Sequence, residues 1–104
     1  MKKEERIKKN QEFDKFIKTT KYNKNAFFIL HFNKKKEEKS RFGIAVGTKI
    51  GNAVIRNKFK RRVREIINEE KKLFSKDQDY IIIVRKQCLE LNYEQMKDKL
   101  TQLI

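Results

Sequence analysis

The sequence of 104 residues has few of the groups that build catalytic and metal sites. It contains one cysteine, Cys88, and one histidine, His31. A single cysteine excludes an internal disulfide and a cysteine-rich zinc site, and we interpret Cys88 as a small, partly buried core residue. Asp77 and Asp79 are two carboxylates in a short turn, without further ligands nearby. With no Ser/His/Asp set and no glycine-rich phosphate loop either, the sequence predicts neither a catalytic residue nor a metal site of its own.

Long apolar segments are missing as well. There is no run of eighteen apolar residues, so no segment is expected to span a bilayer. The first ten residues, MKKEERIKKN, lack the apolar core of a signal peptide, and we therefore expect a cytoplasmic protein without a membrane partner. The length predicts a single domain over residues 1–104, in which residues 1–9 form either a solvated tail or a basic arm that lies on RNA.

Positive charge is what the sequence has in excess. Lysine and arginine number 28 against 14 acidic residues, which gives a net charge of +14 and a pI near 10.0. This excess is larger than solubility requires and indicates a polyanionic partner, either a nucleic acid or a membrane surface.

The basic residues are most concentrated in KIGNAVIRNKFKRRVR, residues 49–64, where seven cations occur without a single acid. Apolar residues recur at helical spacing in and after this segment, and they give one buried stripe: Phe59, Val63, Ile66 and Ile67. The pattern predicts a helix from Ala53 to Leu73, with Asn52 as its N-cap.

The charge on this helix is arranged in a way that opposes its dipole. Arg56, Lys60 and Arg64 follow one another at i, i+4 and i+8 along one flank, and basic residues occupy the first turns, where acids would be favoured. Free N–H groups and cations together form a site for phosphate, so we predict that the N-terminal half of this helix meets a phosphate backbone.

The remaining pattern predicts an α+β domain with the order α-β-β-α-β-α and a small mixed sheet on which the helices pack. The expected elements are a helix at 11–19, strands at 26–32, 41–49 and 80–84, and a last helix capped by Asn92 and Gln95. We interpret residues 19–25 as a loop and expect the first two strands to form an antiparallel hairpin. The apolar run at 80–84 should be a central strand, and the crossover before it should be right-handed by the general rule.

Several aromatic residues allow two interpretations. Phe13 and Phe16 on the first helix are either core residues or a platform for a ligand. His31 should share a strand face with Phe27 and Ile29, and as a lone histidine on a strand it is expected to be an edge residue or a residue with a polar partner.

The segment KIGNAVIRNKFKRRVRE resembles the "RNR" signature of the bacterial ribonuclease P protein subunit, and the length and element order of the chain agree with that family. One position departs from the signature, because Lys58 stands where the family usually has arginine; the charge is kept but the planar fork is lost. The resemblance implies a left-handed crossover, contrary to the general rule. It also implies that a catalytic RNA, using bound magnesium, removes the 5′ leader of precursor tRNA, with one protein per RNA and no cofactor on the protein alone.

The resemblance also implies roles for individual residues. The expected RNA contacts are Lys49, Asn52, Arg56, Asn57, Lys58, Lys60, Arg61 and Arg64. Asn57 could instead be a buried amide that orders the turn. The expected cleft for the single-stranded leader is formed by Phe13, Ile17, Phe27 and His31, with Phe16 as the alternative to Ile17. His31 stands where the family commonly has a tyrosine, and its imidazole could stack on a base in the same way.

A second interpretation fits the composition equally well. The protein could be a structural RNA-binding protein, such as a ribosomal protein, with no part in processing. Dependence on the leader separates the two, since only a ribonuclease P subunit should prefer precursor tRNA to mature tRNA when its RNA is present.

Overall fold

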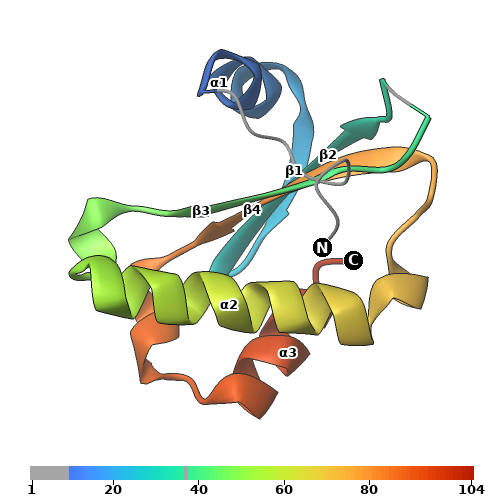
Figure 1. Ribbon diagram of the computed structural model, residues 1–104. Coiled ribbons are helices and arrows are strands. Elements are labelled where there is room, and N and C mark those ends of the chain that lie inside the picture. Colours follow the sequence, from blue (N-terminus) through green and yellow to red (C-terminus); the bar gives the residue numbers. More distant parts are fainter. Residues whose placement is uncertain (1–9, 37) are drawn as a thin grey trace.

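The computed structural model describes residues 10–36 and 38–104, and Figure 1 shows them as one sheet with helices on both faces. The helices are α1 (Asn10–Thr19), α2 (Ala53–Glu69) and α3 (Tyr93–Thr101). The strands are β1 (Lys21–Lys24), β2 (Phe28–Lys34), β3 (Phe42–Val46) and β4 (Gln78–Val84). Three short 3₁₀ turns connect them: η2 (Thr48–Ile50), η3 (Lys71–Leu73) and η4 (Lys86–Glu90). The predicted basic arm at 1–9 lies outside the described residues.

The sheet is mixed, as predicted, and its strand order is β1-β2-β4-β3. β2 pairs antiparallel with both β1 and β4, whereas β3 pairs parallel with β4. The antiparallel hairpin predicted between residues 26–32 and 41–49 is therefore wrong, because β4 lies between these two strands. The continuous apolar run of β4 is the physical reason: a strand that is apolar on both faces gains most from a central position.

The prediction of a loop at residues 19–25 is also wrong, because this segment contains β1. All four residues of β1 are exposed, and its sequence, KYNK, has none of the alternation of a half-buried strand. β1 is an edge strand held by its backbone pairing with β2, so its side chains carry no signal of its secondary structure.

The main core lies between the sheet and the layer formed by α2 and α3 (Figure 1). The predicted apolar stripe of α2 is confirmed, since Phe59, Val63, Ile66 and Ile67 are all buried. Asn52 caps α2 by accepting a hydrogen bond from the backbone N–H of Ile55, as predicted. α2 ends at Glu69 rather than at Leu73, where η3 replaces its last turn.

The opposite face of the sheet has a smaller core beneath α1. Phe16 and Ile81 are buried there, and Ile17 and Ile83 pack partly against them. Phe16 is therefore a core residue rather than an exposed platform. The glycine and alanine of β3 lie on this face, where Ala45 remains half-buried.

A buried ion pair joins Arg41, the residue before β3, to Asp79 in β4. One guanidinium nitrogen of Arg41, Nη2, lies 3.3 Å from Oδ2 of Asp79, and the backbone N–H of Arg41 donates to Oδ1 at 2.8 Å. Both side chains are almost fully buried. Asp79 thus has a structural role.

None of the described helices is long and apolar enough to cross a bilayer.

Candidate RNA interface

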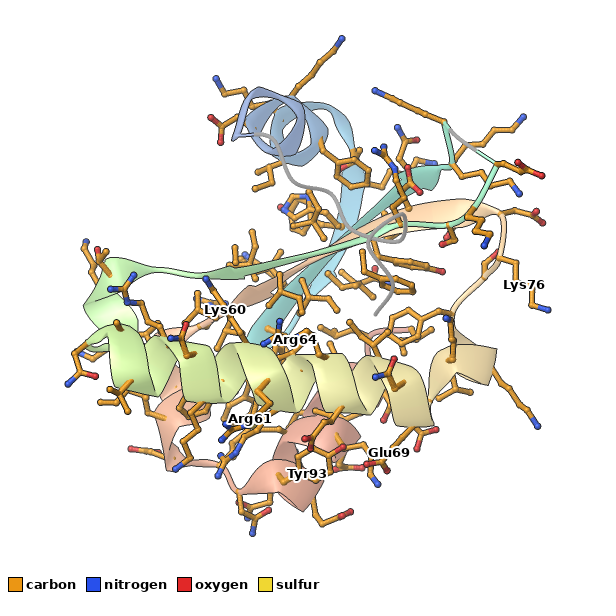
Figure 2. The ribbon with its side chains drawn as sticks, viewed as in Figure 1. Lys60, Arg61, Arg64, Glu69, Lys76 and Tyr93 are labelled. Atoms are coloured by element: carbon orange, nitrogen blue, oxygen red, sulfur yellow. The ribbon has the colours of Figure 1, made fainter. Side chains whose placement is uncertain are left out.

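The first half of α2, with η2 before it, presents a basic surface, which we define as Lys49, Asn52, Arg56, Asn57, Lys58, Lys60, Arg61 and Arg64. All eight residues are exposed or half-buried. Figure 2 shows Lys60 and Arg64 on the flank of α2 nearer to the sheet and Arg61 on the flank nearer to α3. Among the residues that the structure describes, none of the seven cations of residues 49–64 forms an ion pair with a carboxylate. Their charge is therefore available to a polyanion.

The N-terminal end of α2 is fixed tightly enough to present this surface in one geometry. Asn52 caps the helix, and the Nε of Arg56 donates to the carbonyl oxygen of Gly51 at 3.1 Å. A Cβ atom at Gly51 would lie 3.0 Å from the side chain of Ile55, so glycine permits this close approach. The helix dipole and the free N–H groups of the first turn add to the positive potential here.

Asn57 and Arg62 lie outside the apolar stripe of α2 and have different environments. Asn57 is exposed, so the interpretation of a buried amide that orders the turn is wrong; on an ideal helix it faces away from the stripe that α2 buries. Arg62 turns towards α3, where Nη1 donates to the carbonyl oxygen of Leu91 at 3.3 Å and the guanidinium lies 5.4 Å from the ring centre of Phe59. Arg62 therefore joins α2 to the segment before α3.

Exposed apolar side chains accompany the cations, a feature that was not predicted from the sequence. Val54 is 77% exposed in the first turn of α2, and Ile55 beside it is also exposed. Ordinary amphipathic patterning gives no reason for exposed apolar residues at this position, and such residues can contact bases or sugars of a bound nucleic acid.

The structure does not bring all the expected cleft residues together. Ile17 is half-buried beside Phe16 on the α1 face, and Phe13 lies in α1. Phe27 precedes β2, packs against the main core, and has its ring 5.7 Å from the Nζ of Lys99 in α3. Phe27 therefore belongs to the α3 side of the sheet, and the predicted shared face of Phe27 and His31 is wrong because β2 begins only at Phe28.

His31 lies on the α1 face but is only 6% exposed. Its Nδ1 is 3.3 Å from the Oγ1 of Thr20, whose hydroxyl donates to the carbonyl oxygen of Phe16 at 2.6 Å. The Thr20 oxygen therefore accepts from the imidazole, and Nδ1 carries the proton of the neutral ring. Burial lowers the pKa of His31, which favours this neutral form. The interpretation of His31 as a partnered residue fits this geometry better than open stacking on a base.

A hollow of about 570 Å³ lies beside the basic surface, at the carboxyl ends of the parallel strands β3 and β4. Residues 47–50 and 83–87 line it, and they include Lys49, Arg85 and Lys86 but no acid. Arg85 and Lys86 were not predicted as site residues. The signal was available in principle, because ligands tend to bind where parallel strands end and a crossover between these two strands was predicted.

The described residues contain no group of three or more His, Cys, Asp or Glu that could hold a metal ion. Burial raises the pKa of the Cys88 thiol to about 12, which makes it an unreactive core residue, as expected. The cations, helix N–H groups and exposed apolar side chains of this surface can bind an anionic, base-bearing polymer.

A four-stranded mixed sheet, with a helix on one face whose segment before Glu65 is basic and includes no acid, defines a small α+β RNA-binding protein. Comparison with known families narrows this class, because the family model described as Ribonuclease P matches residues 1–104. The chain belongs to the ribonuclease P protein family, as its signature indicated.

Individual relatives agree with this assignment. The chain is 44% identical to the ribonuclease P protein component of Bacillus cereus (strain B4264), over 96% of this chain and 88% of that protein. The corresponding component of Bacillus anthracis (strain CDC 684 / NRRL 3495) is 43% identical over 96% of this chain and 85% of its own length.

Solved structures of ribonuclease P proteins have the same fold. The protein from Staphylococcus aureus superposes with a TM-score of 0.86 at 34% identity, covering 95% of this chain and 91% of that one. The protein from Thermotoga maritima gives a TM-score of 0.84 at 33% identity, covering 94% and 93%.

Proposed function

We propose that this protein is the protein subunit of a ribonuclease P and acts with ribonuclease P RNA in removing the 5′ leader from precursor tRNA. One observation carries the proposal: the signature residues form a basic surface on α2 from which acids are absent. Phosphate contacts from Arg56, Lys60, Arg61 and Arg64 would fix the position of the protein on the folded RNA. Lys58 would contribute charge without the paired hydrogen bonds of arginine.

Bond cleavage is assigned to the RNA, with magnesium bound in the complex of RNA and protein. The protein would contribute binding energy and would lower the magnesium concentration that the RNA needs, because added cations reduce repulsion between RNA and substrate. We expect one protein per RNA, and we expect the complex to work in the cytoplasm.

The leader is proposed to bind next to the basic surface rather than on it. The cationic hollow at Lys49, Arg85 and Lys86 opens beside the half-buried residues Ile83 and Ala45 on the α1 face. Phe13 and Ile17 on α1 are proposed to border the same path. A single strand here would have phosphates near cations and bases near apolar side chains, the usual arrangement for single-stranded RNA.

Reconstitution with a bacterial ribonuclease P RNA at low magnesium tests the proposal. Cleavage of a precursor tRNA is followed with and without the protein, and binding of precursor is compared with binding of mature tRNA. We expect the protein to restore cleavage and to favour the precursor, and Phe13→Ala should weaken precursor binding alone. If cleavage does not change while the protein still binds RNA broadly, a structural RNA-binding role replaces the proposal.

A further inference from the structure

The strand register on the α1 face arranges side chains in rows that cross the whole sheet. One row contains Lys24, Ile29, Ile83 and Ala45, which belong to β1, β2, β4 and β3 in that order. The three residues of β2, β4 and β3 in this row are half-buried, and Lys24 is exposed. Neighbouring strands lie about 4.8 Å apart, so the row extends roughly 14 Å from the cationic hollow to the free edge of β1.

The adjacent row ends in an exposed aromatic residue. Tyr22 of β1 is the cross-strand partner of His31, which pairs in turn with the buried Ile81. The rings of Tyr22 and His31 lie 5.3 Å apart between centroids and are tilted by 43°. Tyr22 is 53% exposed, whereas His31 beneath it is 6% exposed. The buried imidazole therefore supports a tyrosine ring that has an open surface.

The two faces of β1 differ in a way that directs these side chains. The side-chain amide of Asn23 donates to the carbonyl oxygen of Leu103, which places Asn23 on the α3 side of the sheet. Because side chains alternate along a strand, Tyr22 and Lys24 lie together on the α1 side and Lys21 lies on the other. An aromatic ring next to a cation on an exposed strand is the arrangement that binds single-stranded RNA without sequence preference.

We propose that Tyr22 is a stacking site for one nucleobase of single-stranded RNA, with Lys24 near the adjoining phosphate, at the β1 end of the path that begins in the cationic hollow. The RNA is the 5′ leader, a choice that rests on the proposed function. A leader that enters at Lys49 and Arg85 and crosses the half-buried row would reach Tyr22 only with its nucleotides farthest from the cleavage site.

The site is tested in the complex of the protein with ribonuclease P RNA, using precursor tRNAs whose leaders increase in length one nucleotide at a time. Tyr22→Ala should weaken the binding of long-leader precursors about fivefold or more. Fivefold corresponds to the lower end of the range expected for the loss of one stacked base. Precursors with the shortest leaders and mature tRNA should bind as they do to the wild-type complex. Tyr22→Phe, which keeps the ring, should bind every leader normally.

Lys24 and Lys21 provide a matched control, because they carry the same charge on the same strand but on opposite faces. Lys24→Ala should weaken long-leader binding and Lys21→Ala should not. Thermal melting of each variant checks the fold. Equal losses from both lysine variants, or equal losses of precursor and mature tRNA in Tyr22→Ala, would overturn the proposed site.

Fluorescence of 2-aminopurine gives a readout of stacking that does not depend on the leader assignment. The base is placed at successive positions of the leader, and separately in a single-stranded oligonucleotide mixed with the protein alone. One position should be quenched by wild type and Tyr22→Phe but not by Tyr22→Ala, and equal quenching by all three contradicts the site. If the wild-type complex shows no dependence on the leader, the proposed function is contradicted. The oligonucleotide measurement would then still show whether Tyr22 stacks on a base.

Discussion

The two halves of α2 use charge in opposite ways. In the N-terminal half, the cations between Arg56 and Arg64 have no carboxylate partners among the described residues. In the C-terminal half, Glu69 accepts hydrogen bonds from the hydroxyl of Tyr93 and, at 3.1 Å, from the Nζ of Lys97, which also lies 3.4 Å from Glu94. Figure 2 shows Glu69 and Tyr93 together where α2 and α3 meet, on the opposite flank of α2 from Lys60.

The charged residues of α2 therefore fall into two groups: those that stabilise the fold through ion pairs, and those that are available to bind a partner. Acids are present where a cation stabilises the contact between two helices, and they are absent where phosphates would supply the negative charge. The N-terminal half is costly in the free protein, because like charges repel and cations lie near the positive end of the helix dipole. A bound anion relieves this repulsion, so the same cations that destabilise the free protein strengthen the binding of a polyanion.

The largest effect is expected from removing two charges in the N-terminal half. Arg61→Gln with Arg64→Gln should weaken binding of ribonuclease P RNA by at least tenfold, and the slope of log K against log salt should fall by about 0.9 for each phosphate that is no longer neutralised. Titrations at several salt concentrations measure both quantities. Thermal stability should not fall, because neither arginine forms an ion pair with a described carboxylate.

A second double variant removes the same net charge elsewhere. Lys72→Gln with Lys76→Gln changes exposed residues after the C-terminal half of α2. Its affinity for the RNA should remain within about twofold of wild type, since unlocalised charge is screened at physiological salt. Equal losses in the two double variants would mean that net charge, rather than the basic surface, determines binding.

A smaller effect is expected when a simple anion replaces the RNA. Sulfate binding at the basic surface should stabilise the folded protein by about 1.4 kcal/mol at ten times its Kd, which raises Tm by several degrees for a domain of this size. Melting is compared in sodium sulfate and in sodium chloride of equal ionic strength. The Arg61/Arg64 double variant should lose most of the difference, and a Tm that is unchanged by sulfate in the wild type would contradict the prediction.

The sequence predicted the elements whose side chains repeat with a clear period. The apolar stripe at Phe59, Val63, Ile66 and Ile67 and the apolar run of β4 both gave correct elements, and the caps at Asn52 and Asn92 were recognisable from residue type and spacing. The acid-free segment also located the basic surface. These features are local, so a single sequence contains them in full.

What the sequence could not predict depends on pairing between distant segments. β1 has no buried side chain, and its pairing with β2 leaves no periodic pattern in its own sequence. The insertion of β4 between β2 and β3 brings Arg85 and Lys86 next to Lys49 and places Phe27 with α3. The unpredicted pairing of β2 with β4 therefore made the prediction of the cleft residues less accurate than that of the basic surface. Most residues of the basic surface lie on one helix, so their arrangement does not depend on strand pairing.

The smallest effect is expected in the C-terminal half, and it depends on pH. Hydrogen bonds from Tyr93 and Lys97 lower the pKa of Glu69 below its usual 4.5. A carboxyl group whose pKa is lower in the folded state stabilises the protein above its unfolded pKa, and this contribution is lost as the pH falls through the folded value. Glu69→Gln should therefore be less stable than wild type at pH 7, and the difference should shrink as the pH decreases below about 4.5.

Denaturant unfolding between pH 3 and pH 7 measures this difference, and two further variants identify its origin. Tyr93→Phe should reduce the pH-dependent contribution of Glu69 to stability in part, because one of the hydrogen bonds that lower the pKa of Glu69 is removed. Glu65→Gln, one turn earlier on the same exposed side of α2, should leave the pH dependence close to that of wild type. All three variants should bind ribonuclease P RNA normally. A loss of RNA affinity in Glu69→Gln would show that the two halves of α2 are coupled, and the division between fold-stabilising and partner-binding charge would then have to be abandoned.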